Sequence, residues 1–60
     1  MKITEVTVLA EQLLAAHGDN AEAEAAQRAT IADRAGNTGE AEQWRQVRTA
    51  VHALRGPHAS

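Results

Sequence analysis

The residues of this chain best suited to chemistry near neutral pH are three histidines, His17, His52 and His58. A metal site needs two or more ligands that converge, usually together with a carboxylate or a cysteine. No two of the histidines are spaced four residues apart, as a pair on one helix face would be, and the chain has no cysteine. We therefore expect neither a metal ion nor another cofactor. We interpret His17 as a residue at the C-terminal end of a helix, where the helix dipole favours positive charge.

Nucleophilic catalysis has few residues to work with in this sequence. The chain has no cysteine, and its first serine is also its last residue, Ser60. The segment Gly36–Gly39 lacks the lysine and the preceding strand of a phosphate-binding loop. Aspartate, glutamate and histidine are present, but no spacing places an acid–base pair in a cleft, and three short helices enclose little concave surface. The sequence predicts no catalytic residues and a protein that is not an enzyme.

The arginines form the other group of chemical interest, because arginine is suited to phosphate and nucleic acid. Three of the five fall on one expected helix, which also carries Glu40 and Glu42. The formal net charge is −2, and no platform of aromatic residues accompanies the arginines. We interpret them as part of a solvated face held by salt bridges, and we expect no nucleic-acid partner. The arginines are Arg28, Arg34, Arg45, Arg48 and Arg55.

The surroundings of the protein follow from similar observations. No apolar run approaches the length of a transmembrane helix, so no membrane partner is expected. The beginning of the chain, Met1–Thr4, lacks the apolar region of a signal peptide. The lack of cysteine gives no indication of an oxidising compartment. The sequence therefore favours the cytoplasm.

The elements that must position these residues are organised around the segment Ala35–Leu54. Gly36 can adopt the left-handed conformation that ends a helix, and Asn37 is a good N-cap for the next one. Glu40 lies three residues later, where its carboxylate can reach back to the cap. A helix over residues 38–55 then follows, ending at Gly56-Pro57. Its apolar face consists of Trp44, Val47, Val51 and Leu54, with alanines at the margins.

The start of the chain predicts a helix over residues 4–17. Val6, Leu9 and Leu13 recur on one broad face, and Val8 points away from it. The β-branched opening Ile3–Val8 is also compatible with a strand. We favour a helix because the spacing beyond Val6 is helical and the chain offers no second strand for pairing.

The middle of the chain predicts a helix over residues 20–35. Gly18-Asp19-Asn20-Ala21-Glu22 repeats the pattern Gly36-Asn37-Thr38-Gly39-Glu40, with Asp19 in the place of the N-cap and Glu22 in that of the capping-box glutamate. The inner face of this helix is mostly alanine, which lets two helix axes approach closely but buries little apolar area. Its expected members are Ala21, Ala25, Arg28 or Ala29, Ala32 and Ala35.

Together these elements predict a single all-α domain over residues 1–60, a small up-down three-helix unit. The second and third helices form a hairpin, the first helix covers its apolar side, and residues 56–60 form a frayed tail. A chain of 60 residues with no disulfide rarely builds a sufficient core alone. We therefore expect a homo-oligomer, with a dimer favoured. The residues expected to be divided between the core and the interface are Val6, Leu9, Leu13, Trp44, Val47, Val51 and Leu54.

Two resemblances add to this interpretation. The segment Ala26–Leu54 resembles a single tetratricopeptide-type hairpin, with Ala29, Gly36 and Ala41 at the small-residue positions. The large residue near the start of the family's first helix is missing, and Arg45 stands where an aromatic residue is typical. The resemblance implies hairpin geometry, and peptide binding is not transferred from it.

The whole chain also resembles a class of small uncharacterised bacterial three-helix proteins. The residues that carry this likeness are His17-Gly18-Asp19, Ala25 with Arg28-Ala29, Ala35-Gly36-Asn37 and Trp44-Arg45-Gln46-Val47. This resemblance implies the same helical architecture and no particular activity.

Three functional hypotheses follow from the sequence. The first is a non-enzymatic protein that self-associates and acts as an interaction or scaffolding module. The second is an accessory or regulatory subunit that binds a larger protein through the apolar face of the first helix. The third is a small DNA-associated regulator that uses the arginines of the last helix.

Overall fold

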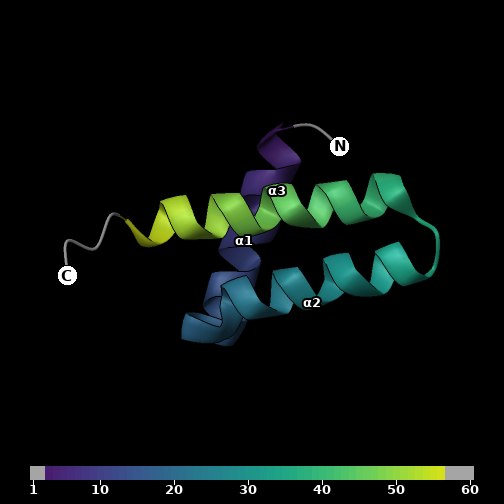
Figure 1. Cartoon of the computed structure of the whole chain (residues 1–60). Coiled ribbons are helices and arrows are strands. Elements are labelled where there is room, and N and C mark those ends of the chain that lie inside the picture. Colours follow the sequence, from purple (N-terminus) through teal and green to yellow (C-terminus); the bar gives the residue numbers. More distant parts are fainter. Residues whose placement is uncertain (1–2, 57–60) are drawn as a thin grey trace.

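The computed structural model describes residues 3–56, and Figure 1 shows their arrangement. Its elements are α1 (Ile3–His17), a short 3-10 helix η1 (Gly18–Asn20), α2 (Ala21–Arg34) and α3 (Thr38–Arg55). The predicted all-α class is therefore confirmed, and the helix ends lie within one residue of the expected ones. Ile3–Val8 is helical, so the strand alternative is wrong. Of the expected tail at residues 56–60, only Gly56 lies among the described residues, and His58 lies outside them.

The helices α2 and α3 form an antiparallel hairpin, and α1 lies across it rather than alongside it (Figure 1). The hairpin turns sharply because Gly36 adopts a left-handed conformation, with φ +81°. The N–H of Gly36 donates to the carbonyl of Asp33 at 3.0 Å, and the N–H of Asn37 donates to the carbonyl of Ala32 at 2.8 Å. This pair of bonds is a Schellman motif, which satisfies carbonyls left free at the end of α2.

The junction between α1 and α2 also contains a left-handed glycine, but the chain continues differently after it. Gly18 is also left-handed, with φ +56°, but η1 follows it directly. The N–H of Ala21 donates to the carbonyl of Gly18, so the 3-10 turn itself leads into α2. Asn20 consequently occupies the N-cap position of α2. The prediction of Asp19 as this cap is wrong by one residue.

The side-chain capping bonds expected at both junctions are not formed. Asn37 is the N-cap of α3 as predicted, yet neither Asn20 nor Asn37 makes a side-chain cap hydrogen bond. Glu40 lies in the first turn of α3, where its charge still suits the helix dipole. Glu22 lies in the first turn of α2, but its carboxylate is used in ion pairs with α3 instead.

The core lies where α1 crosses the hairpin, and it consists mostly of small side chains. Leu13 is the largest buried side chain among the described residues, and Val47 and Val51 are the largest that are fully buried. The alanine face of α2 is buried as predicted, with the exception of Ala35, which is exposed because α2 already ends at Arg34. The alanines let the three helices pack closely but contribute little apolar area. Among the residues whose burial is described, the buried ones are Val6, Ala10, Leu13, Ala21, Ala25, Ala29, Ala32, Ala41, Val47 and Val51.

Candidate functional site

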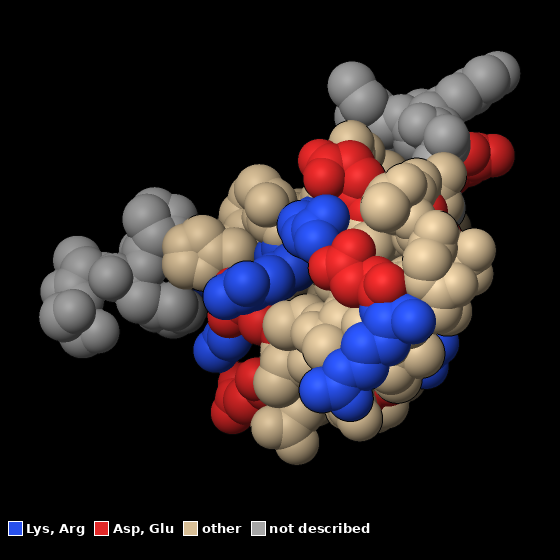
Figure 2. Space-filling model, turned by 45° about the vertical axis from the view of Figure 1, so that its right-hand side comes forward, with Lys and Arg blue, Asp and Glu red and all other residues tan. Residues whose placement is uncertain are grey.

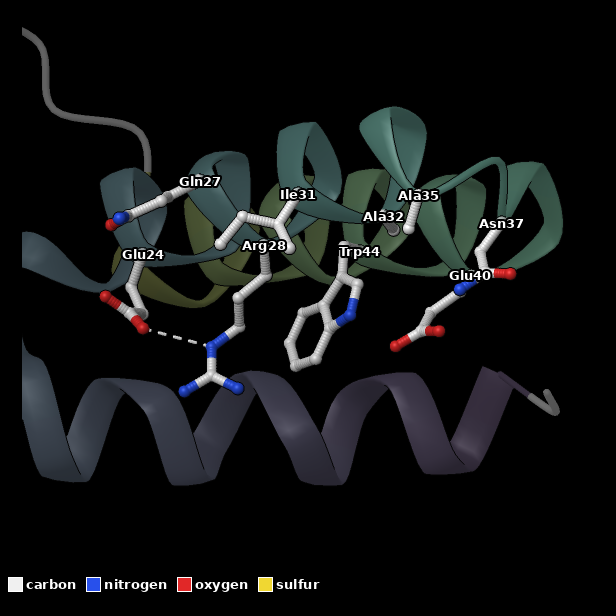
Figure 3. Close-up of a pocket in the computed structure, with 9 residues that line it drawn as sticks. All are labelled: Glu24, Gln27, Arg28, Ile31, Ala32, Ala35, Asn37, Glu40 and Trp44. Carbon is white, nitrogen blue, oxygen red and sulfur yellow. Dashed lines mark hydrogen bonds and ion pairs between the residues drawn. The ribbon is translucent and has the colours of Figure 1, made fainter.

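Trp44 lines a groove of about 370 Å³ near the loop end of the hairpin. α1 crosses the hairpin at some distance from the loop, so this end of the hairpin is left uncovered (Figure 1). We call this surface the hairpin groove. Its lining residues come from α2, the loop and α3, and they are Glu24, Gln27, Arg28, Ile31, Ala32, Ala35, Asn37, Glu40 and Trp44 (Figure 3).

Trp44 lies between the core and the hairpin groove. Its indole is partly buried and packs against the buried cluster. Trp44 was expected in the core or an interface, and its position at the boundary fits both roles. Beside it, Ile31 is 56% exposed. The groove therefore presents apolar area to solvent from both helices of the hairpin.

A charged pair on α2 covers one side of Trp44. The Nε of Arg28 donates to Oε1 of Glu24 at 3.0 Å, one helical turn away. The Arg28 guanidinium lies 5.1 Å from the centroid of the indole, in the geometry of a cation–π contact. On the other side of the indole stands Glu40, whose carboxylate points the same way as that of Glu24 (Figure 3). Arg28, which was a candidate for the inner face of α2, thus lies in the groove, while Ala29 is buried.

The seven residues expected to form the core and interface fall into three groups. Val6, Leu13, Val47 and Val51 are buried within the chain. Leu9 and Trp44 are partly buried and pack against them. Leu54 is 47% exposed and lies outside the core. Of the residues predicted to be divided between core and interface, four therefore lie in the core. Leu9, Trp44 and Leu54 retain exposed apolar area that an interface could cover.

Two of the three arginines of α3, Arg45 and Arg55, lie in ion pairs with neighbouring acidic groups. Arg55 Nη1 donates to Glu22 at 2.9 Å, and His52 Nδ1 lies 2.9 Å from the other oxygen of the same carboxylate. Arg45 pairs with Asp33 of α2 and with Glu42 of its own helix. Basic and acidic side chains are interspersed over the face shown in Figure 2. The salt bridges expected from the sequence are formed at Arg28, Arg45 and Arg55, whereas Arg34 and Arg48 make no ion pair with the described residues.

The side chains and helices of residues 3–56 bear on metal binding and on membrane insertion. No group of three or more histidine, aspartate or glutamate side chains is arranged to hold a metal ion in this part of the chain. His17 ends α1 as expected, while His52 pairs with Glu22. None of the helices described here has the length and apolar character needed to cross a bilayer.

The hairpin groove was not found from the sequence. Glu24 and Arg28 have the spacing of an i, i+4 ion pair, which is a visible signal. The contact of Arg28 with Trp44 joins residues of different helices and depends on the register of the hairpin, which the pattern alone does not give. Comparisons with protein-family models, with curated proteins and with solved structures found no match.

Proposed function

We propose that this chain is a non-enzymatic helical protein of the cytoplasm that self-associates, most simply as a two-fold dimer, and acts as an interaction or scaffolding module. The observation that carries the proposal is the distribution of large apolar side chains. Among the side chains described, Leu13 is the only one larger than valine that is buried, whereas Ile31 and Leu54 are exposed and Leu9, Leu14 and Trp44 are only partly covered.

A core of this kind gives a folded chain little stability. Burial of apolar area contributes about 25 cal/mol per Å², and alanine has little area to bury. Small single domains without a disulfide or a metal are only marginally stable for this reason. A second copy that covers the remaining leucines adds apolar burial that the single chain lacks.

Fewer apolar residues are exposed and available for assembly than the sequence suggested. Val6, Ala10 and Leu13 of α1 are buried against the hairpin. This burial argues against an accessory subunit that docks through the main face of α1. It leaves Leu54, at the exposed end of the apolar face of α3, as the residue best placed for contact with a second copy.

The experiment that tests the proposal is light scattering over a wide range of protein concentration, with helicity followed by circular dichroism at each point. A dimer that loses helicity on dilution supports the proposal, because assembly then completes the core. A monomer that keeps full helicity at the highest concentration would contradict it.

A further inference from the structure

Beyond self-association, we propose that the hairpin groove binds a basic segment of a partner protein, with one arginine or lysine side chain held between Trp44 and Glu40. The proposal requires a dimer interface that leaves the hairpin groove open, such as one at Leu54. It commits to a cationic peptide as the ligand, and it is argued from the charges and the indole that line the groove.

The groove already holds one cation by the same chemistry. Arg28 lies between a carboxylate and the indole, with its Nε 3.0 Å from Glu24 and its guanidinium 5.1 Å from the ring centroid. Its side chain is 46% exposed, so water reaches the site and the contact still forms. The indole of Trp44 is therefore oriented to accept positive charge in this groove.

On the opposite side of Trp44 from Arg28, Glu40 supplies a second carboxylate to the groove (Figure 3). Glu40 lies one helical turn before Trp44 on α3, and both side chains point into the groove (Figure 3). No described residue makes an ion pair or hydrogen bond with the Glu40 side chain. With Glu24 already paired to Arg28, Glu40 gives the groove an excess of negative charge, which favours a cation from outside.

The apolar residues that line the groove favour a long cationic side chain over a small inorganic cation as the ligand. Ile31 and Ala35 are exposed and line the groove beside Trp44. The methylene stem of arginine or lysine can lie on such a wall while its charged end stays in contact with water and a carboxylate. A groove of about 370 Å³ is large enough for one such side chain and part of its neighbours.

The test uses the full chain and two short peptides. One is a capped pentapeptide with a central arginine flanked by leucines, and the other replaces that arginine with citrulline, which has the same shape without the charge. Trp44 is the only tryptophan, so its fluorescence reports on the groove directly. We expect saturable binding of the arginine peptide, and binding of the citrulline peptide weaker by about 1.4- to fivefold, which corresponds to the range measured for exposed ion pairs.

The matched variants are Glu40→Gln and Glu11→Gln, which remove the same charge from the groove and from the exposed side of α1. Glu40→Gln should reduce the preference for the arginine peptide, and Glu11→Gln should keep it, with helicity unchanged in both. Equal binding of the two peptides, or equal effects of the two variants, would overturn the proposal. So would a shift of Trp44 emission with protein concentration alone, because a second copy would then cover the groove.

Discussion

The guanidinium of Arg28 lies 5.1 Å from the centre of the Trp44 ring, and this contact joins α2 to α3 at the edge of the core. Arg28 is oriented by Glu24, so three residues from two helices form one arrangement on the surface. The contact is partly exposed to water, and a cation–π interaction in such a place contributes about 0.5–1 kcal/mol. The contact also covers part of the Trp44 ring, which is only partly buried.

Arg28→Ala should therefore expose Trp44 to water and destabilise the protein slightly. We expect tryptophan emission to move to longer wavelength and the free energy of unfolding in urea to fall by about 1 kcal/mol. Arg34→Ala is the matched control, because Arg34 is exposed on the same helix and makes no ion pair with the described residues. Equal emission and stability in the two variants would mean that the contact with Trp44 contributes nothing.

The small core makes Val47 more important than its size suggests. Val47→Ala removes two methyl groups from a fully buried site that is surrounded by other small residues and cannot readily collapse. We expect a loss of about 2 kcal/mol in the free energy of unfolding, a large part of what a domain of this size has. Val8→Ala makes the same change at a site that is 47% exposed, and its effect should be within about 0.5 kcal/mol. Thermal unfolding followed by circular dichroism distinguishes the two.

The helices and most of the core could be predicted because they depend on local signals. Apolar spacing located Val6, Leu13, Val47 and Val51, and Gly18 and Gly36 marked the helix ends. The Asp19 cap failed because a 3-10 turn after Gly18 carried the chain one residue further before α2 began. Such a choice depends on how α1 crosses the hairpin, which periodicity does not encode.

The hairpin groove lay beyond prediction for a related reason. Which of Arg28 and Ala29 faces inward is decided by a rotation of α2 about its axis, and both residues fitted the alanine face. The structure buries Ala29 and leaves Arg28 over Trp44. Contacts between helices can be predicted only when the register of the hairpin is known. The candidate site depends on such contacts and contains no recognisable sequence motif.

The turn between α2 and α3 gives a prediction with opposite signs at two glycines. Gly36 has φ +81°, so Gly36→Ala should lower the free energy of unfolding by about 1 kcal/mol even though a Cβ there meets no other atom. Gly39 lies in the first turn of α3 without a positive φ, also in open space, and Gly39→Ala should raise stability by about 0.5 kcal/mol. Urea unfolding of both variants tests this. The same sign for the two would show that backbone conformation does not govern this turn.

Glu22 joins the start of α2 to the end of α3 through both of its oxygens. Arg55 and His52 each approach the carboxylate to 2.9 Å, and the Glu22 side chain is 28% exposed. Glu22→Gln should lower the free energy of unfolding by about 1 kcal/mol at low salt, and less at high salt, where surface charges are screened. Glu11→Gln, which removes the same charge from α1, should have no such salt-dependent effect. A loss that does not change with salt would mean that the pairing is not electrostatic in origin.

The division of the apolar residues between core and interface gives the prediction that bears most directly on function. Leu54 is 47% exposed, so Leu54→Asp should leave the helical fold of one chain in place while weakening its assembly. Leu13 is only 8% exposed, and Leu13→Asp would bury a charge among apolar groups, so dissociation and unfolding should occur together. Light scattering and circular dichroism on both variants separate these outcomes. A folded monomer after Leu13→Asp would contradict the assignment of Leu13 to the core. An unchanged dimer after Leu54→Asp would move the interface away from the end of α3.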